Sequence, residues 1–153
     1  MTKNFVEQTF YIIKPEGLKN AAAIKEIILN NDLKIIESKQ LLLKKDIIKV
    51  LYSNLNKDLL EAHFKFMCNK INELGIIEGQ NAVKKFLEIS GKHTNPDLCS
   101  SGTIRNIFGE KMKYKIGQAI YYKNAIHRSK TLLEATRDID IFRKLQQQEI
   151  ATS

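Results

Sequence analysis

The sequence has no tryptophan, and its 153 residues include only 2 cysteines and 2 prolines. Cys68 and Cys99 are far apart and form no C-x-x-C spacing. This argues against a zinc or redox centre and agrees with a reducing compartment. The longest apolar runs are a few residues long, far below the roughly 18 residues of a membrane span. The N-terminal stretch MTKNFVEQTFYIIKPEG carries charges and has no signal-peptide block, so we expect a cytoplasmic protein with no membrane partner.

Acidic residues are also scarce relative to basic ones. There are 17 Asp and Glu against 25 Lys and Arg, a net charge of +8. Such a balance favours anionic partners such as nucleotides or nucleic acid. The lysines are scattered, however, so a solvated surface explains them equally well, and nucleic-acid binding is indicated by charge alone. The length fits one domain over 1–153 that can bury a sizeable core.

Several catalytic motifs are missing. The chain contains no P-loop, no GxGxxG, no HExxH and no G-x-S-x-G sequence. Any phosphoryl chemistry must therefore use another scaffold.

The remaining pattern alternates strand-like and helix-like segments. Strands are predicted at 8–14, 33–43, 74–79 and from 120, and helices at 21–31, 46–55, 58–68, 81–90 and from 131. Residues 92–120 are expected to be mostly loop with a short helical stretch at 102–108, and the tail 146–153 is expected to fray. Thr131 and Glu134 have capping-box spacing at the start of the last helix. The alternation predicts an α+β sandwich with helices packed on one sheet.

Three short stretches are suited to binding phosphate. YIIKPEG holds Lys14 at a strand end before a rigid turn, and EGQNAV turns through Gly79 into a helix whose amides could meet an anion. HTNPDLCSSGTIRNIFG is a long loop in which Thr94 and Arg105 could wrap a polyphosphate. Taken alone, each stretch also fits an ordinary solvated lysine, helix start or surface loop.

His127 lies in NAIHRSKTLLEA, at the junction of a strand and a helix. A neutral imidazole there can attack phosphorus, because its ordinary pKa of about 6.5 leaves a free lone pair at cellular pH. A second residue must then hold the other ring nitrogen, and a purely structural histidine is the alternative. His63 lies on an apolar helix stripe, which favours a packing role, and His93 lies in a loop without an assigned role.

Taken in order, TFYIIKPEG, EGQNAV, TNPD…SGTIRNIFG and NAIHRS resemble the nucleoside diphosphate kinase family, from about residue 8 to about residue 143. The resemblance implies a ferredoxin-like α+β sandwich with a four-stranded antiparallel sheet covered by helices. It also implies transfer of the γ-phosphate from a nucleoside triphosphate to a nucleoside diphosphate, by a ping-pong mechanism through a phosphohistidine. ATP and other nucleoside di- and triphosphates would be the substrates, and the protein would form a homo-oligomer.

By position, the resemblance makes His127 the nucleophile. Asp138 falls where the family usually has a glutamate that orients the far ring nitrogen, and its shorter side chain favours a water bridge. The substrate-binding residues would be Lys14, Tyr52, Leu60, Thr94, Arg105 and Asn124, with Ser129 in support. Mg²⁺ would bind through the nucleotide phosphates with few or no protein ligands, and the base would stack beside the helix at 58–68.

The chain departs from the family pattern at several positions. Leu87 replaces an arginine that binds phosphate, Arg128 replaces a glycine or alanine after the histidine, and Lys130 replaces an acid. Ser101 replaces a proline of the nucleotide loop, Leu59 or Leu60 replaces the aromatic residue that stacks on the base, and residues 110–123 form an insertion. These changes make the pocket more basic and less aromatic. They leave open a degenerate nucleotide-binding or scaffold module with little catalytic activity.

Overall fold

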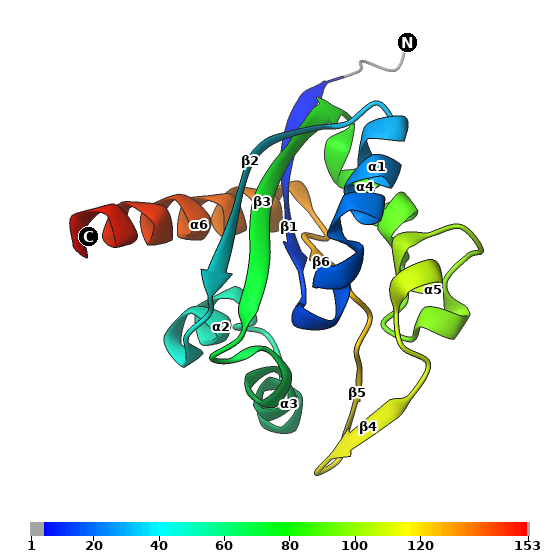
Figure 1. Ribbon diagram of the computed structural model, residues 1–153, viewed down its shortest axis with the longest axis vertical. Helices are drawn as coiled ribbons and strands as arrows, with labels where there is room; N and C mark the ends of the chain where they lie inside the picture. The colour runs from blue at the N-terminus through cyan, green and yellow to red at the C-terminus, as the bar shows by residue number, and fades with distance from the viewer. Residues whose placement is uncertain (1–4, 153) are drawn as a thin grey trace.

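The computed structural model describes residues 5–152 and is built around a four-stranded antiparallel sheet (Figure 1). The strands follow the order β2-β3-β1-β6. Their bounds are Val6–Ile13 for β1, Lys34–Leu42 for β2, Ile71–Gln80 for β3 and Ile126–Arg128 for β6. The expected sheet is therefore confirmed, and its short strand β6 forms an edge beside β1.

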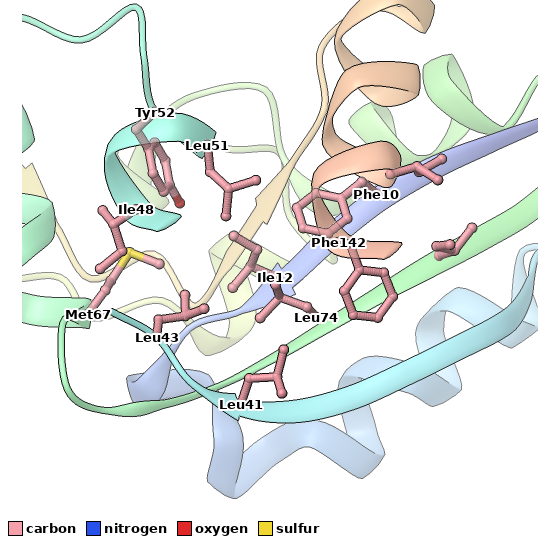
Figure 2. Close-up of a cluster of buried hydrophobic side chains, with 12 residues drawn as sticks. Phe10, Ile12, Leu41, Leu43, Ile48, Leu51, Tyr52, Met67, Leu74 and Phe142 are labelled. Atoms are coloured by element: carbon pink, nitrogen blue, oxygen red, sulfur yellow. The ribbon is translucent and has the colours of Figure 1, made fainter. Parts of the chain in front are cut away.

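Helices cover both faces of the sheet, because the side chains of β1 alternate between two hydrophobic clusters. Phe10 and Ile12 pack on one face, in the cluster shown in Figure 2, and Tyr11 and Ile13 pack on the other. The first face is covered by α2 (Lys45–Leu51), α3 (Lys57–Met67) and α6 (Leu132–Thr152), and the second by α1 (Ala21–Asn30), α4 (Ala82–Ser90) and α5 (Ile104–Phe108). Two 3₁₀ turns, η1 (Pro15–Asn20) and η2 (Pro96–Leu98), complete the element order.

The segment 120–127 is not one strand, as the sequence had suggested. It divides between β6 and a separate two-stranded hairpin of β4 (Lys113–Ile116) and β5 (Ala119–Tyr122). The start of the predicted strand corresponds to β5, whereas β4 lies within the region predicted to be loop. Gly117 takes a left-handed backbone with a φ of 58° at the hairpin turn, a conformation that glycine adopts without steric cost. Ala125 has a φ of 73°, and this bend separates the hairpin from β6.

The hairpin is attached to α3. The rings of Tyr121 and Phe66 stack with their centroids 4.8 Å apart, and the Gln118 amide donates to the Asp58 carboxylate at 2.9 Å. Figure 1 shows β4 and β5 projecting from the main sheet alongside α3. The insertion therefore forms one wall next to that helix.

Two other boundaries differ from the prediction. The first helix of the pair ends at Leu51 instead of continuing to residue 55, and the helix predicted to fray from 146 continues to Thr152. An ion pair between Lys144 and Asp140, one turn apart on α6, supports this last helix. Within residues 5–152, no helix combines the length and apolar character needed to cross a membrane.

Candidate active site

A cleft of about 240 Å³ opens between the α2–α3 region, the hairpin, β6 and the start of α6. Five of the nine predicted site residues line it, namely Lys14, Tyr52, Thr94, Arg105 and His127. A larger hollow of about 740 Å³ lies between the start of β1 and α6, and none of the predicted site residues lines it. The fold therefore gathers these five residues from five separate parts of the chain into the smaller cleft.

Lys14 is fixed at the end of β1, where the chain turns into η1. Its backbone N–H donates to the Ala125 carbonyl at 2.9 Å, and its Nζ donates to Asn124 Oδ1 at 3.1 Å. Asn124 in turn donates through Nδ2 to the Thr94 carbonyl at 3.1 Å. Asn124 thus lies directly behind the cleft and links the loop of Thr94 to the lysine.

The pKa of Lys14 is lowered to about 8, mainly by burial, with Glu16 opposing the shift and the charges of Arg105 and Arg128 adding to it. The lysine is therefore mostly charged at neutral pH. Its Nζ also lies 4.5 Å from the centroid of the Tyr121 ring, an arrangement that stabilises a partly desolvated ammonium group.

Arg105 caps the free edge of β6 from the short helix α5. Its Nε and Nη2 both donate to the Ile126 carbonyl, at 3.1 and 2.9 Å, and its Nη1 donates to the His93 carbonyl at 2.9 Å. The side chain is buried, and no carboxylate of the described residues pairs with it. A buried charge without a counterion is costly, so this guanidinium prepares the cleft for an anion.

His127 projects from β6, where it pairs in register with Ile12 of β1. Its ring packs against Tyr52, with centroids 4.8 Å apart, and against Phe10 at 6.4 Å. The Nε2 atom is buried and has no hydrogen-bond partner. Because no hydrogen bond of the described residues engages Nδ1 either, Nδ1 is the ring nitrogen left open to the cleft.

The electrostatic surroundings keep this imidazole neutral. Burial is the main cause that places the pKa of His127 well below 6.5, and the charges of Arg105, Arg128 and Lys14 act in the same direction. A neutral ring retains the lone pair that nucleophilic attack requires.

Asp138 is completely buried on α6, next to the histidine. It accepts hydrogen bonds from Ser129 Oγ at 2.9 Å and from Arg137 Nη2 at 3.1 Å. Burial raises its pKa, while these two bonds oppose the rise. A ring nitrogen of His127 and carboxylate oxygens of Glu134 and Asp138 lie within 4.8 Å of one another, but no hydrogen bond joins Asp138 to the ring. This spacing is compatible with the predicted water bridge.

The structure also brings in residues that the sequence did not single out for the site. Glu134 donates its backbone N–H to Thr131 Oγ1 at 3.1 Å, as the capping pattern predicts, but its side chain lines the cleft near His127. His63 lines the cleft as well as packing on its helix, with its ring 4.2 Å from that of Tyr52 and 5.0 Å from that of Tyr121. The apolar stripe predicted the burial of His63, whereas the strand predicted from residue 120 contains Tyr121 but does not indicate that its ring faces the cleft.

The end of the cleft between α3 and the hairpin is more apolar. Leu55, Leu59 and Ile120 line it. Leu60, which was predicted to contact the base, instead packs against the core cluster on the α2 and α6 side of the sheet. Leu59, one residue earlier on α3, takes the place facing the cleft.

Comparisons with known proteins agree with this geometry. A sequence model of the family described as nucleoside diphosphate kinase matches residues 7–149. The chain is 31% identical over 141 residues to the nucleoside diphosphate kinase of Wolbachia sp. subsp. Drosophila simulans (strain wRi), covering 90% of this chain and 94% of that protein. It is 32% identical over 142 residues to that of Wigglesworthia glossinidia brevipalpis, covering 91% and 93%.

Solved structures of such proteins have the same fold. Nucleoside diphosphate kinase from Encephalitozoon cuniculi, without ligand, superposes with a TM-score of 0.73 at 26% identity, covering 88% of this chain and 87% of that one. The enzyme from Borrelia burgdorferi, solved as a transition-state mimic with vanadate and ADP, superposes with a TM-score of 0.76 at 23% identity, covering 89% and 86%.

Proposed function

Since this chain belongs to the nucleoside diphosphate kinase family, we propose that it transfers the γ-phosphate of a nucleoside triphosphate to a nucleoside diphosphate through a phosphohistidine at His127. The observation that carries the proposal is the open nitrogen of a neutral imidazole in a cleft whose buried cations lack counterions. His127, Lys14 and Arg105 all line this cleft. A phosphoryl donor would supply the negative charge that these cations lack.

The first half-reaction forms one bond and breaks another. The lone pair of His127 Nδ1 forms a bond to the γ-phosphorus, while the bond from that phosphorus to the bridging oxygen breaks. The diphosphate leaves with the bonding electron pair. In the second half-reaction, an oxygen of a different diphosphate displaces the histidine, and the free imidazole is regenerated. Two matched steps of this kind produce ping-pong kinetics.

The protein's task is mainly to position the phosphates and offset their charge. Lys14 and Arg105 supply fixed positive charge, and the Tyr52 hydroxyl is buried beside the ring without a hydrogen-bond partner. This hydroxyl is free to donate to the transferred phosphoryl group. Thr94 lines the cleft from the loop that Asn124 anchors, and it would reach the β-phosphate.

Mg²⁺ fits the site as an ion that arrives on the nucleotide. Lys14, Arg105 and Arg128 are basic residues of the cleft, and the buried carboxylate of Asp138 is engaged by Ser129 and Arg137. Glu134 is a carboxylate that also lines the cleft, so the lining offers few protein ligands and would suit an ion held mainly by the nucleotide. When bound, the ion would neutralise phosphate charge. The oligomer implied by the resemblance and the cytoplasmic location expected from the N-terminal sequence remain predictions.

The apolar end of the cleft would hold the base. Leu59 of α3 and Ile120 of the hairpin both line it, and aliphatic walls make few hydrogen bonds that could distinguish one base from another. We therefore expect broad base tolerance with weak stacking.

Exchange of labelled phosphate from ATP to GDP in the presence of Mg²⁺ tests the proposal. The His127→Asn variant should lose both the acid-labile label and the exchange. His93→Asn is the matched control, because this exposed loop histidine uses only its backbone carbonyl in the described contacts, and it should keep both. Nucleotide binding without exchange in the wild-type protein would favour the degenerate binding module instead.

A further inference from the structure

We propose that Arg128 is a phosphate-binding residue of the cleft and contacts the diphosphate moiety of the bound nucleotide. The inference rests on the proposed function and extends it to a residue at which the family pattern has no side-chain donor. Three features of Arg128 support it: its position, its burial without a counterion and its unused hydrogen-bonding capacity.

Arg128 follows the nucleophile on the edge strand and projects from the opposite face of the sheet. It pairs in register with Tyr11 of β1, whereas His127 pairs with Ile12. The guanidinium lies at the C-terminal end of α4, where Nε donates to Ser90 Oγ at 3.2 Å and Nη2 donates to the Gly91 carbonyl at 2.9 Å. Because β6 is an edge strand, side chains from both of its faces line the same cleft.

The charge of Arg128 is buried without an ion-pair partner. Its side chain is only 3% exposed, and both of its acceptors are uncharged oxygens. Glu134 is the carboxylate that acts on it most strongly, but the two form no ion pair among the described residues. Such a cation lowers the stability of the free protein unless an anion occupies the cleft.

One nitrogen of Arg128 is free to bind a ligand. No hydrogen bond of the described residues uses Nη1, while the bonds of Nε and Nη2 hold the guanidinium plane in place. A guanidinium fixed in this way can donate to phosphate oxygens with little loss of side-chain entropy. Its charge also contributes to the lowered pKa values of Lys14, Arg105 and His127, so all four groups belong to one positive field.

A purely structural role is the competing explanation, because Arg128 also ties β6 to α4. Comparing ligands with and without phosphates separates the two roles. Loss of a phosphate contact weakens binding of ADP but not of adenosine, whereas distortion of the cleft weakens binding of both.

Calorimetric titration with ADP and Mg²⁺, and separately with adenosine, tests the proposal on the full chain. Arg128→Gln should weaken ADP binding about 10- to 100-fold, which corresponds to the loss of a charge-assisted hydrogen bond, and should change adenosine binding less than about twofold. Arg128→Lys keeps the charge but loses the fork of donors. It should weaken ADP binding about 3- to 10-fold, and it decides the question if the glutamine variant fails to fold.

Arg143→Gln is the matched control for net charge. Arg143 lies on α6 outside the cleft and pairs with Glu37 at 3.6 Å, so its removal should leave ADP binding unchanged. Unchanged ADP binding in the folded Arg128 variants, or an equal loss for ADP and adenosine, would overturn the role of Arg128 while leaving the phosphotransfer proposal intact. Failure of the wild-type protein to bind ADP would overturn both.

Discussion

The buried carboxylate at position 138 offers a quantitative test of how the nucleophile is oriented. In the present chain a ring nitrogen of His127 and an oxygen of Asp138 lie within 4.8 Å, and Nε2 has no hydrogen-bond partner. Asp138→Glu adds one carbon–carbon bond of about 1.5 Å, which can reduce a separation of at most 4.8 Å to about 3.3 Å or less. That distance is at the limit of a direct N–H···O hydrogen bond.

Two effects of this substitution oppose each other. Pairing a buried donor with a charged acceptor is worth about 1.5–3 kcal/mol, and crowding a fully buried site costs about 1–3 kcal/mol. The two nearly cancel in the ground state, so we expect Tm to change by less than about 4 °C. The ring gains positive charge as it accepts phosphate, which strengthens the new bond in the transition state. We therefore expect phosphorylation to become about tenfold faster, equivalent to about 1.4 kcal/mol.

Rapid-quench measurement of phosphoenzyme formation from ATP would give this rate. Asp140→Glu is the matched control, because it adds the same methylene at a solvent-exposed position of α6 that pairs with Lys144, and it should leave the rate unchanged. A folded Asp138→Glu variant that phosphorylates more slowly than wild type, or at the same rate, would refute the idea that the missing hydrogen bond limits the nucleophile.

Three further predictions concern the pH response and the two ends of the cleft. The kcat/KM for ATP should be level from about pH 6 to neutrality, because the pKa of His127 lies well below 6.5, and should fall above about pH 8 as Lys14 loses its charge; an acidic limb near pH 6.5 would contradict this. Leu59→Phe should lower the KM for purine nucleotides about 3- to 10-fold through added stacking on the base. Leu60→Phe should instead lower Tm by overpacking the core, without lowering KM. Equal effects of the two variants on KM would contradict the placement of these two leucines. Tyr52→Phe should leave Tm unchanged or slightly raised, because its buried hydroxyl has no partner, and should slow phosphorylation about tenfold; an unchanged rate in stopped-flow or quench experiments would exclude the hydroxyl as a phosphate donor.

The main sheet and its covering helices were predictable because their apolar residues follow clear periods. Phe10 to Ile13 alternate between two clusters, and Ile24 and Ile28 form a helical stripe. The pairing of the hairpin was not predictable in the same way, because lysines alternate with Tyr114 and Ile116 on β4, and most residues of the two strands are exposed or only partly buried. A pattern of that kind carries little hydrophobic contrast, so β4 falls in the predicted loop, and the strand predicted from residue 120 gives no sign that Tyr121 faces the cleft.

The site residues are also of two kinds. Short sequence motifs indicate some of them, and only the tertiary packing identifies the others. Lys14 and Arg105 occupy motif positions, and both line the cleft. Which of Leu59 and Leu60 faces the cleft depends on the rotation of α3 about its axis. The sequence does not determine that rotation closely enough to choose between two neighbouring residues. The capping-box spacing already explained the presence of Glu134. The sequence therefore gave no reason to expect its side chain in the cleft.

Leu87 and Arg128, which both depart from the family pattern, also show that sequence position alone does not reveal which residues lie close together in the fold. In the sequence, Leu87 and Arg128 are two separate losses from the family pattern, both of which favour a degenerate module. In the structure, the Arg128 guanidinium contacts Ser90 and Gly91, about one turn beyond Leu87 on α4. A positive charge is therefore present at this end of α4 although the helix itself carries leucine at position 87.

The central claim is that His127 carries the phosphoryl group between two nucleotides that never need to be bound together. Its most direct test is to incubate the protein with ATP and Mg²⁺, remove all nucleotide, identify the modified residue by mass spectrometry under conditions that preserve phosphohistidine, and then add GDP alone. We expect a single phosphate on His127 that is transferred quantitatively to GDP. A phosphate on another residue, or transfer that occurs only when ATP and GDP are present together, would contradict it.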